Sequence, residues 1–161
     1  MSQIYLNEAS ILDLEFYNAL RNDANNANPL NWSHWAPESL EKTESYILEH
    51  TGKLFTFQLV DETKIGYVKL SKRFARGSAY EECEEIGIFL CEGFRGRGFA
   101  PKMLLLAEAA YCHQQGLLAT VDSRNLASIN SFNRAGYRLV GQIPVIDSVS
   151  KEPCEIFYLV K

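Results

Sequence analysis

A strand-like segment, a bend with two glycines and a helix-like segment follow one another directly over residues 84–115. The first reads EEIGIFL, the bend CEGFRGRGFA and the last PKMLLLAEAAYCHQQ. Gly96 and Gly98 allow positive φ and close approach of a ligand, and Pro101 suits the first turn of a helix. Free amides at a helix N-terminus beside two arginines are typical of an anion site. We therefore expect this bend to bind phosphate.

The rest of the chain alternates strand and helix patterns around this unit. Two amphipathic helices come first, separated by an Asn- and Pro-rich loop with Trp32 and Trp35. We expect these rings to pin the loop to the core rather than to close over a ligand. The helix after the bend is predicted over 101–115, with Gly116 at its end. The expected order is β-α-α-β-β-β-α-β-α-β-β, a single α/β domain (an α+β mixed sheet) over residues 1–161 with a right-handed parallel crossover.

Charge and composition exclude several classes of protein. Sixteen Lys and Arg stand against 20 Asp and Glu, for a net charge of −4, whereas a general nucleic-acid binder would be basic. The densest apolar stretch is too short to span a bilayer, and no secretory leader is visible. Four cysteines and three histidines show no metal-ligand spacing, so we expect no metal, free thiols and a cytoplasmic protein.

Two familiar phosphate-binding patterns do not fit the bend. It has no Gly-Lys-Ser/Thr for a P-loop, and Pro101 stands where a dinucleotide fingerprint has its third glycine. RGRGFA does match R-x-x-G-x-A, the pyrophosphate signature of the GCN5-related N-acetyltransferases (GNAT). A second segment, NLASINSFNRAGY, follows at that family's spacing. The chain resembles the family over nearly all its length, most strongly from Glu84 to Gly141, and is similar to its ribosomal-protein N-terminal and amino-sugar branches.

The resemblance implies a GNAT-like acyl-CoA N-acyltransferase fold with splayed central parallel strands and acetyl-CoA as cosubstrate. Loop amides and the helix dipole would hold the pyrophosphate, with charge-assisted contacts from the arginines. The pantetheine arm would pair with the strand before the loop, and an amide near Phe89 or Leu90 would polarise the thioester carbonyl. The expected cofactor-binding residues are Ile88, Phe89, Leu90, Arg95, Gly96, Arg97, Gly98, Phe99, Ala100, Asn125, Ser128 and Phe132.

Three carboxylates are candidates for taking the proton from an amine acceptor. Glu84 is the first choice, because several relatives carry their base eleven residues before the residue that corresponds to Arg95. Glu85 would face the opposite side of a regular strand, and Asp122 on the next strand is third. The alternative interpretation is that the acidic run YEECEE, residues 80–85, which contains Glu84 and Glu85, is only a solvent-exposed edge.

The proton donor for the leaving thiolate stays open. Many relatives have a tyrosine seven residues after the asparagine, but this chain has Phe132, which has no proton to give. Ser128, Tyr137 or Tyr111 are substitutes, or the helix N-terminus stabilises the thiolate. A covalent route through Cys91 is disfavoured, because a free cysteine usually acts as a small apolar residue.

These inferences predict direct transfer of acetyl to a primary amine in a ternary complex. A small acceptor such as an amino sugar is preferred over a protein N-terminus of the ribosomal type. The third alternative, favoured by Phe132, is a non-catalytic acyl-CoA-binding regulatory module. We expect acetyl-CoA and an amine as partners, no nucleic acid, no membrane, and a monomer or homodimer.

Overall fold

The computed structural model describes residues 3–23, 37–71, 83–111, 116–147 and 150–161. These residues form one seven-stranded sheet in the order β1-β2-β3-β4-β5-β7-β6, in which β4 and β5 are parallel and every other pair is antiparallel. The order confirms the predicted mixed sheet with one central parallel pair. The strands are β1 (Ile4–Glu8), β2 (Gly52–Leu59), β3 (Lys64–Ser71), β4 (Glu84–Leu90), β5 (Leu117–Asp122), β6 (Arg138–Ile146) and β7 (Pro153–Val160).

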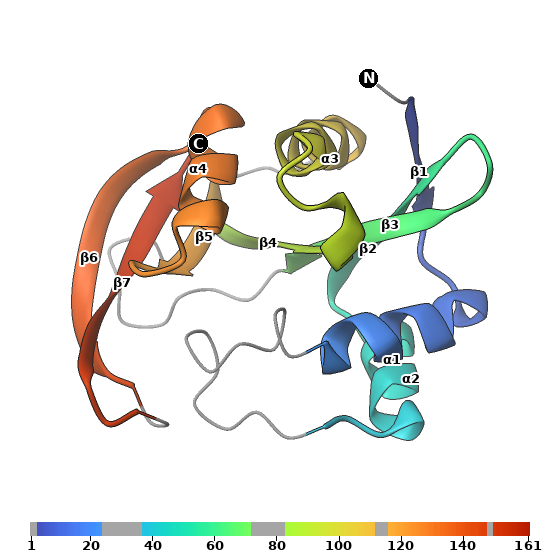
Figure 1. Ribbon diagram of the computed structural model, residues 1–161, viewed down its shortest axis with the longest axis horizontal. Helices are drawn as coiled ribbons and strands as arrows, with labels where there is room; N and C mark the ends of the chain where they lie inside the picture. Colours follow the sequence, from blue (N-terminus) through green and yellow to red (C-terminus); the bar gives the residue numbers. More distant parts are fainter. Residues whose placement is uncertain (1–2, 24–36, 72–82, 112–115, 148–149) are drawn as a thin grey trace.

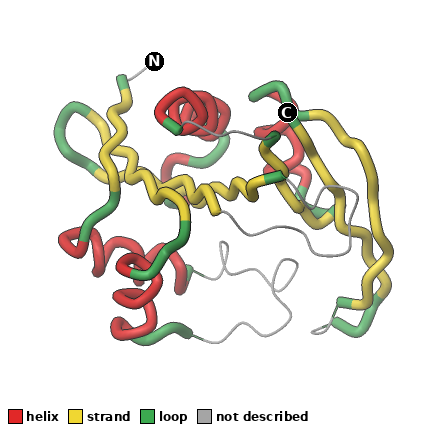
Figure 2. Tube along the Cα trace, turned by 180° about the vertical axis from the view of Figure 1, so that it is seen from behind, coloured by secondary structure: helices red, strands yellow, loops and turns green. Residues whose placement is uncertain are grey.

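Helices lie on both sides of this sheet. α1 and α2 cover one face, and α3 and α4 cover the other, as Figure 1 and the reverse view in Figure 2 show. The first α-helix begins at Leu14, after a 3-10 turn (Ile11–Asp13) around which Ser10 and Asp13 form a capping box. The helices are α1 (Leu14–Asn22), α2 (Leu40–Leu48), α3 (Phe99–Ala110) and α4 (Leu126–Arg134).

The predicted limits of the helix after the bend need correction. α3 begins at Phe99, two residues before Pro101, so the proline occupies the first turn as expected. It ends at Ala110 with Tyr111 as C-cap, so Gly116 does not terminate it. Gly116 instead stands directly before β5, where its carbonyl accepts a hydrogen bond from the Glu84 amide at 3.0 Å. Trp32 and Trp35 lie outside the described residues.

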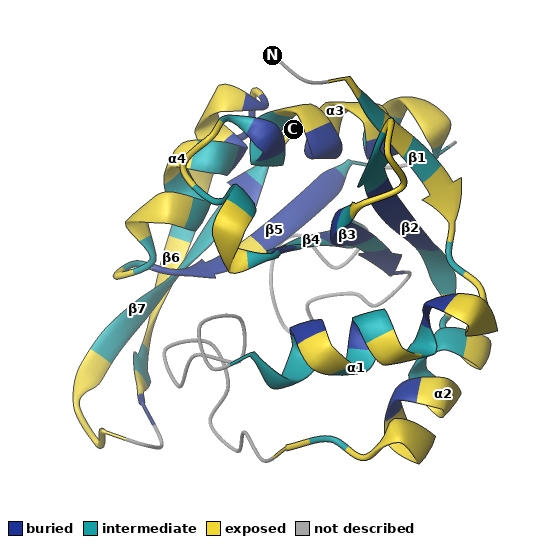
Figure 3. Cartoon of the chain, turned by 45° about the vertical axis from the view of Figure 1, so that its right-hand side comes forward, coloured by how far each residue is buried: buried dark blue, intermediate teal, exposed yellow. Residues whose placement is uncertain are grey.

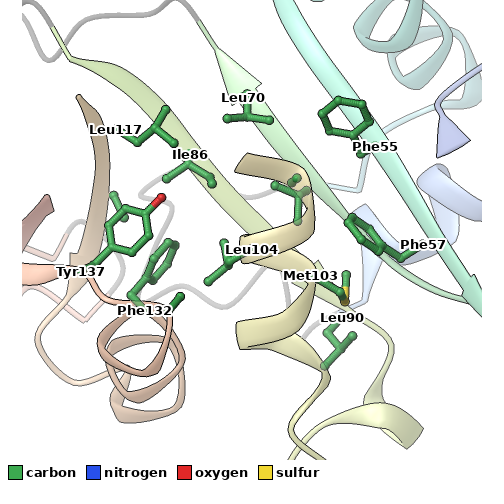
Figure 4. Packing of buried hydrophobic residues seen from close by; sticks show 14 of the residues in the cluster. Phe55, Phe57, Leu70, Ile86, Leu90, Met103, Leu104, Leu117, Phe132 and Tyr137 are labelled. Carbon is green, nitrogen blue, oxygen red and sulfur yellow. The ribbon is translucent and has the colours of Figure 1, made fainter. Parts of the chain in front are cut away.

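The main core lies between the sheet and α3 (Figure 4). β2 and β3 each contain four consecutive buried residues, the pattern expected of strands that are covered on both faces. α4 seals one end of this core with Phe132, whose ring meets Tyr137 edge-on. The largest fully buried side chains of this cluster are Phe57, Ile65, Leu70, Ile86, Met103, Leu104, Leu117, Tyr137 and Leu159.

A smaller core joins the other face of the sheet to α1 and α2. Tyr17 of α1 stacks on Tyr67 of β3 with ring centroids 4.2 Å apart. Tyr67 in turn stacks on Phe89 of β4 at 4.5 Å. Figure 3 shows the buried residues of α1 on the side that faces the sheet. This column of rings fixes α1 against β4, the strand that enters the glycine bend.

Candidate functional site

The two parallel strands separate soon after they meet. β4 and β5 share only two register pairs, Glu84 with Leu117 and Glu85 with Leu118, although β4 continues to Leu90. We call the point where they separate, just beyond Glu85 and Leu118, the fork. Backbone groups of a strand alternate between its two edges, and β3 occupies only one edge of β4. Along Ile86–Phe89, the other edge has no ladder partner among the described strands.

The glycine bend lies at the open end of the fork. Gly96 and Gly98 have φ of 70° and 77°, the left-handed region that the sequence predicted for them. Gly98 is the N-cap of α3, and no side chain caps the helix there. The first turn of α3 also has no acidic residue. The amides and the positive end of the helix dipole therefore suit an anion, and a β-carbon at Gly96 would meet nothing within 4 Å.

The two arginines of the bend both contact protein groups. Arg95 donates from Nε to the Leu90 carbonyl at 3.1 Å, and its Nη2 lies 3.2 Å from Oδ2 of Asp23 at the end of α1. Arg97 donates to the Gly93 carbonyl at 3.3 Å. Arg95 thus braces the bend against α1. These contacts leave the backbone amides as the groups most directly suited to hold a diphosphate.

The N-terminus of α4 lies beside the same end of the sheet, because α4 follows β5 as α3 follows β4. Asn125 is its N-cap, and its side-chain oxygen accepts a hydrogen bond from the Ser128 amide at 3.1 Å. Both residues are half-buried. Two helix N-termini therefore flank the fork, in agreement with the spacing of the two sequence motifs.

The side chains of Glu84 and Glu85 lie on opposite faces of β4. Glu84 is on the α3 side, with one carboxylate oxygen buried and without a hydrogen-bond partner. Burial first, and the neighbouring Glu84 second, raise the pKa of Tyr111 to about 12. Glu85 is on the α1–α2 side, where its carboxylate lies 3.6 Å from the ammonium of Lys69. The regular strand thus places the two candidate bases in different environments.

Asp122, the third candidate, is held by an ion pair. Oδ1 accepts hydrogen bonds from the amide and Nε of Arg124 at 2.8 and 2.9 Å, and Oδ2 lies 2.7 Å from Nη2. The same guanidinium reaches Asp147 in the β6–β7 turn at 2.7 Å. Burial alone would raise the pKa of Asp122, but the Arg124 hydrogen bonds outweigh it and lower that pKa. Such a carboxylate is a weak proton acceptor and a strong structural anchor.

Phe132 and Phe99 belong to the core. Phe132 is 2% exposed and packs edge-on against Tyr137 at 5.1 Å, and Phe99 is equally buried. Their rings are therefore packing groups, and Phe99 contributes to the bend through its backbone. Ala100, the next residue, is half-buried beside the main core.

Two other expectations concern nucleophiles and metals. Cys91 is half-buried, and burial raises the pKa of its thiol, which disfavours the thiolate needed for a covalent route. Within the described part of the chain, no three His, Cys, Asp or Glu residues are grouped to hold a metal ion. His50 instead makes a hydrogen bond to the Leu70 carbonyl at 2.9 Å. None of the helices in the described ranges is long and apolar enough to cross a membrane.

Sequence reasoning missed the partners of these groups: Lys69 beside Glu85, Arg124 beside Asp122, and Asp23 beside Arg95. One signal was available, because an isolated glycine inside a strand often marks close approach by another group. Gly87 in EEIGIFL is such a glycine, and Lys69 lies across it.

A sheet that forks between parallel strands, with an uncapped helix N-terminus at its open end, defines the acyl-CoA acyltransferase fold. The family model described as the acetyltransferase (GNAT) domain matches residues 3–138, so the chain belongs to the GNAT acetyltransferase family. Comparison with curated proteins finds no match.

Solved structures of the family have the same fold. The ribosomal-protein-alanine N-acetyltransferase of Brucella melitensis is 18% identical, with a TM-score of 0.80 over 98% of both chains. A phosphinothricin acetyltransferase of Sinorhizobium meliloti in complex with acetyl-CoA is also 18% identical, with a TM-score of 0.80 over 100% of this chain and 88% of that one. The Vibrio cholerae spermidine N-acetyltransferase, in complex with CoA and spermine, is 17% identical, with a TM-score of 0.78 over 99% and 95%.

Proposed function

We propose that this protein transfers the acetyl group of acetyl-CoA to a primary amine by direct attack in a ternary complex. The observation that carries the proposal is the fork, beyond which β4 has no ladder partner on its β5 side along Ile86–Phe89 among the described strands, close to the glycine bend. A diphosphate bound at the bend would place the attached arm along that edge. The similar structures from Sinorhizobium meliloti and Vibrio cholerae that hold acetyl-CoA or CoA support the choice of ligand.

The residues that we assign to acetyl-CoA follow from this placement. The amides from Arg95 to Ala100 face the diphosphate, assisted by the dipole of α3. The backbone of Ile88, Phe89 and Leu90 pairs with the pantetheine amides, and one of its amides polarises the thioester carbonyl. Asn125 and Ser128, at the start of α4, lie beside the sulfur end of the arm.

Glu85 is the residue that we propose takes the proton from the amine. Four residues of strand rise, about 13 Å, separate Leu90 from Ile86, so an arm lying along this edge ends close to Glu85. Glu85 points to the α1–α2 face, where the β5 residue Thr120 is exposed. Glu84 points to the α3 face, which the main core fills. An acceptor that approaches from the α1–α2 face meets Glu85 first.

The chemistry balances without any other reagent. The amine nitrogen bonds to the thioester carbon, the C–S bond breaks, and the amine proton passes to the Glu85 carboxylate. Because free amines have pKa values near 10, the acceptor at neutral pH first loses one proton to water and attacks as the neutral amine. The proton that Glu85 takes is the second one, which leaves the nitrogen as the new bond forms.

The acceptor that we propose is a small amine, with an amino sugar on a nucleotide as the first candidate. The specific alternative is a protein N-terminus, which the ribosomal-protein-alanine N-acetyltransferase of similar fold suggests. A polyamine is a third class to include, because the spermidine N-acetyltransferase also has this fold.

The test is release of free thiol from acetyl-CoA in the presence of a panel of amino sugars, polyamines and peptides with N-terminal alanine. Acetylated product is identified by mass spectrometry. Turnover on one class supports the proposal and selects the acceptor. Binding of acetyl-CoA with no turnover on any amine would favour a regulatory module, and failure to bind CoA would overturn the proposal.

A further inference from the structure

A lysine side chain from β3 lies across the neighbouring strand at the fork. Lys69 and Gly87 are register partners. A β-carbon at Gly87 would be 2.6 Å from Lys69 Cε, 3.2 Å from Cγ and 3.4 Å from Cδ. The stem of Lys69 therefore lies over Gly87, and a β-carbon at this position would collide with it.

The ammonium of Lys69 is held at this position. Its Nζ lies 3.6 Å from Oε1 of Glu85, on the same face of β4, and the two side chains are 15% and 26% exposed. Glu85 belongs to the last register pair before β4 and β5 separate, and Gly87 is two residues further along β4. Glu85 thus pairs with a largely buried lysine, and the pair lies at the fork.

We propose that Lys69 is the catalytic group that stabilises the departing CoA thiolate and gives it a proton. The inference rests on the proposed function, because it requires the thioester at the fork. It supplies the proton donor that Phe132, a buried core ring, cannot be.

The step returns the protein to its starting state. When the C–S bond breaks, the Lys69 ammonium donates a proton to the sulfur and becomes a neutral amine. Protonated Glu85, which took its proton from the acceptor amine, then passes that proton to Lys69 across the short gap between them. The products are the N-acetylated amine and the CoA thiol, and both side chains regain their charges.

Lys69→Met tests the role of the ammonium, with Lys53→Met as the matched control. Lys53 lies on the neighbouring β2, is more exposed and pairs with Glu8. We expect Lys69→Met to lower kcat by about 10²-fold, the usual contribution of a general acid, with the KM for acetyl-CoA unchanged. Unchanged kcat in Lys69→Met would overturn the inference while leaving the acetyltransferase proposal intact.

A second readout follows the thiol of bound CoA. Ultraviolet absorbance of the thiolate gives its pKa in the binary complex, without any acceptor. We expect the bound thiol to titrate at a lower pH than the thiol of free CoA in the wild type, and to return toward the free value in Lys69→Met. Identical thiol titrations in the two proteins would also overturn the inference, because they would place Lys69 out of reach of the sulfur.

Gly87→Ala displaces Lys69 without removing its charge. The new methyl would collide with Lys69 Cε, and the flexible lysine stem must move away. We expect this change to lower kcat in the wild-type background and to have no further effect in Lys69→Met. The effects of the two substitutions on kcat would then not add, as expected in a double-mutant cycle of residues that act together. An equal loss in both backgrounds would show that the methyl acts on the substrate directly and would refute the route through Lys69.

Discussion

Phe132→Tyr restores the hydroxyl that many members of the family carry at this position, and the structure predicts that it harms the protein. The ring is 2% exposed and meets Tyr137 edge-on at 5.1 Å, so a hydroxyl added at its tip is buried with the ring. A buried hydroxyl without a partner costs about 1–3 kcal/mol. For a domain of this size, each 1 kcal/mol shifts the Tm by about 2–4 °C. We expect the Tm to fall by about 2–12 °C with no gain in kcat.

Tyr137→Phe is the matched opposite change in the same pair of rings. The Tyr137 hydroxyl is already buried without a hydrogen-bond partner, and burial, with Glu108 next to it, raises its pKa above the usual value. Its removal should leave the stability unchanged or raise it. The measurement is thermal and urea unfolding of both variants by circular dichroism, with thiol release measured in parallel.

One result would refute this reasoning. If Phe132→Tyr is as stable as the wild type and raises kcat, its hydroxyl reaches the reacting sulfur. Phe132 would then line the acyl site, as the family resemblance implied, and a proton donor elsewhere would be unnecessary.

Gly98→Ala forces an alanine to adopt a φ of 77°, which costs about 1–2 kcal/mol. We expect this variant to bind acetyl-CoA more weakly in calorimetry. Gly136→Ala, at a φ of 96° outside the bend, is the control and should bind acetyl-CoA normally. Glu85→Gln should lower kcat by about 10²-fold, with a smaller loss in Glu84→Gln; the reverse ranking would make Glu84 the base. The lowered pKa of Asp122 contributes stability that is present above its ordinary pKa of 3.8 and is lost as the pH falls through the folded value. The Tm of the wild type should therefore fall as the pH is lowered through this range. In Arg124→Met the Tm should instead rise as the pH is lowered, because the two buried carboxylates, Asp122 and Asp147, then gain stability by protonation. A fall in Tm like that of the wild type would contradict the anchor role of Asp122.

The glycine bend could be predicted because its determinants are local. Two glycines, a proline three residues after the second glycine, and an apolar helix determine a left-handed turn that leads into a helix N-terminus, whatever surrounds them. The N-cap Asn125 and the fold order were predictable for the same reason: short-range spacing decides them.

The environment of the bend could not be predicted, because its contacts join distant segments. Arg95 forms an ion pair with Asp23, which lies 72 residues away in the sequence. The motif around Arg95 does not indicate that its guanidinium is already paired with a carboxylate. Lys69 and Glu85 become neighbours only through the β3–β4 register. The alternation of a strand puts Glu84 and Glu85 on opposite faces, but sequence alone does not say which face the core fills.

The fork follows from how the sheet is assembled. β4 is held by six register pairs with β3, and β5 by five with β7, yet β4 and β5 share only two. The sheet is thus two antiparallel halves that meet at one short parallel contact, with α3 and α4 entering where the halves part. An extended ligand with its own amide groups can form hydrogen bonds with the backbone of β4 beyond the fork, which apolar side chains cannot do. The same strand that offers this edge carries Glu85 and makes room for Lys69 at Gly87, so cofactor placement and proton transfer depend on a single register.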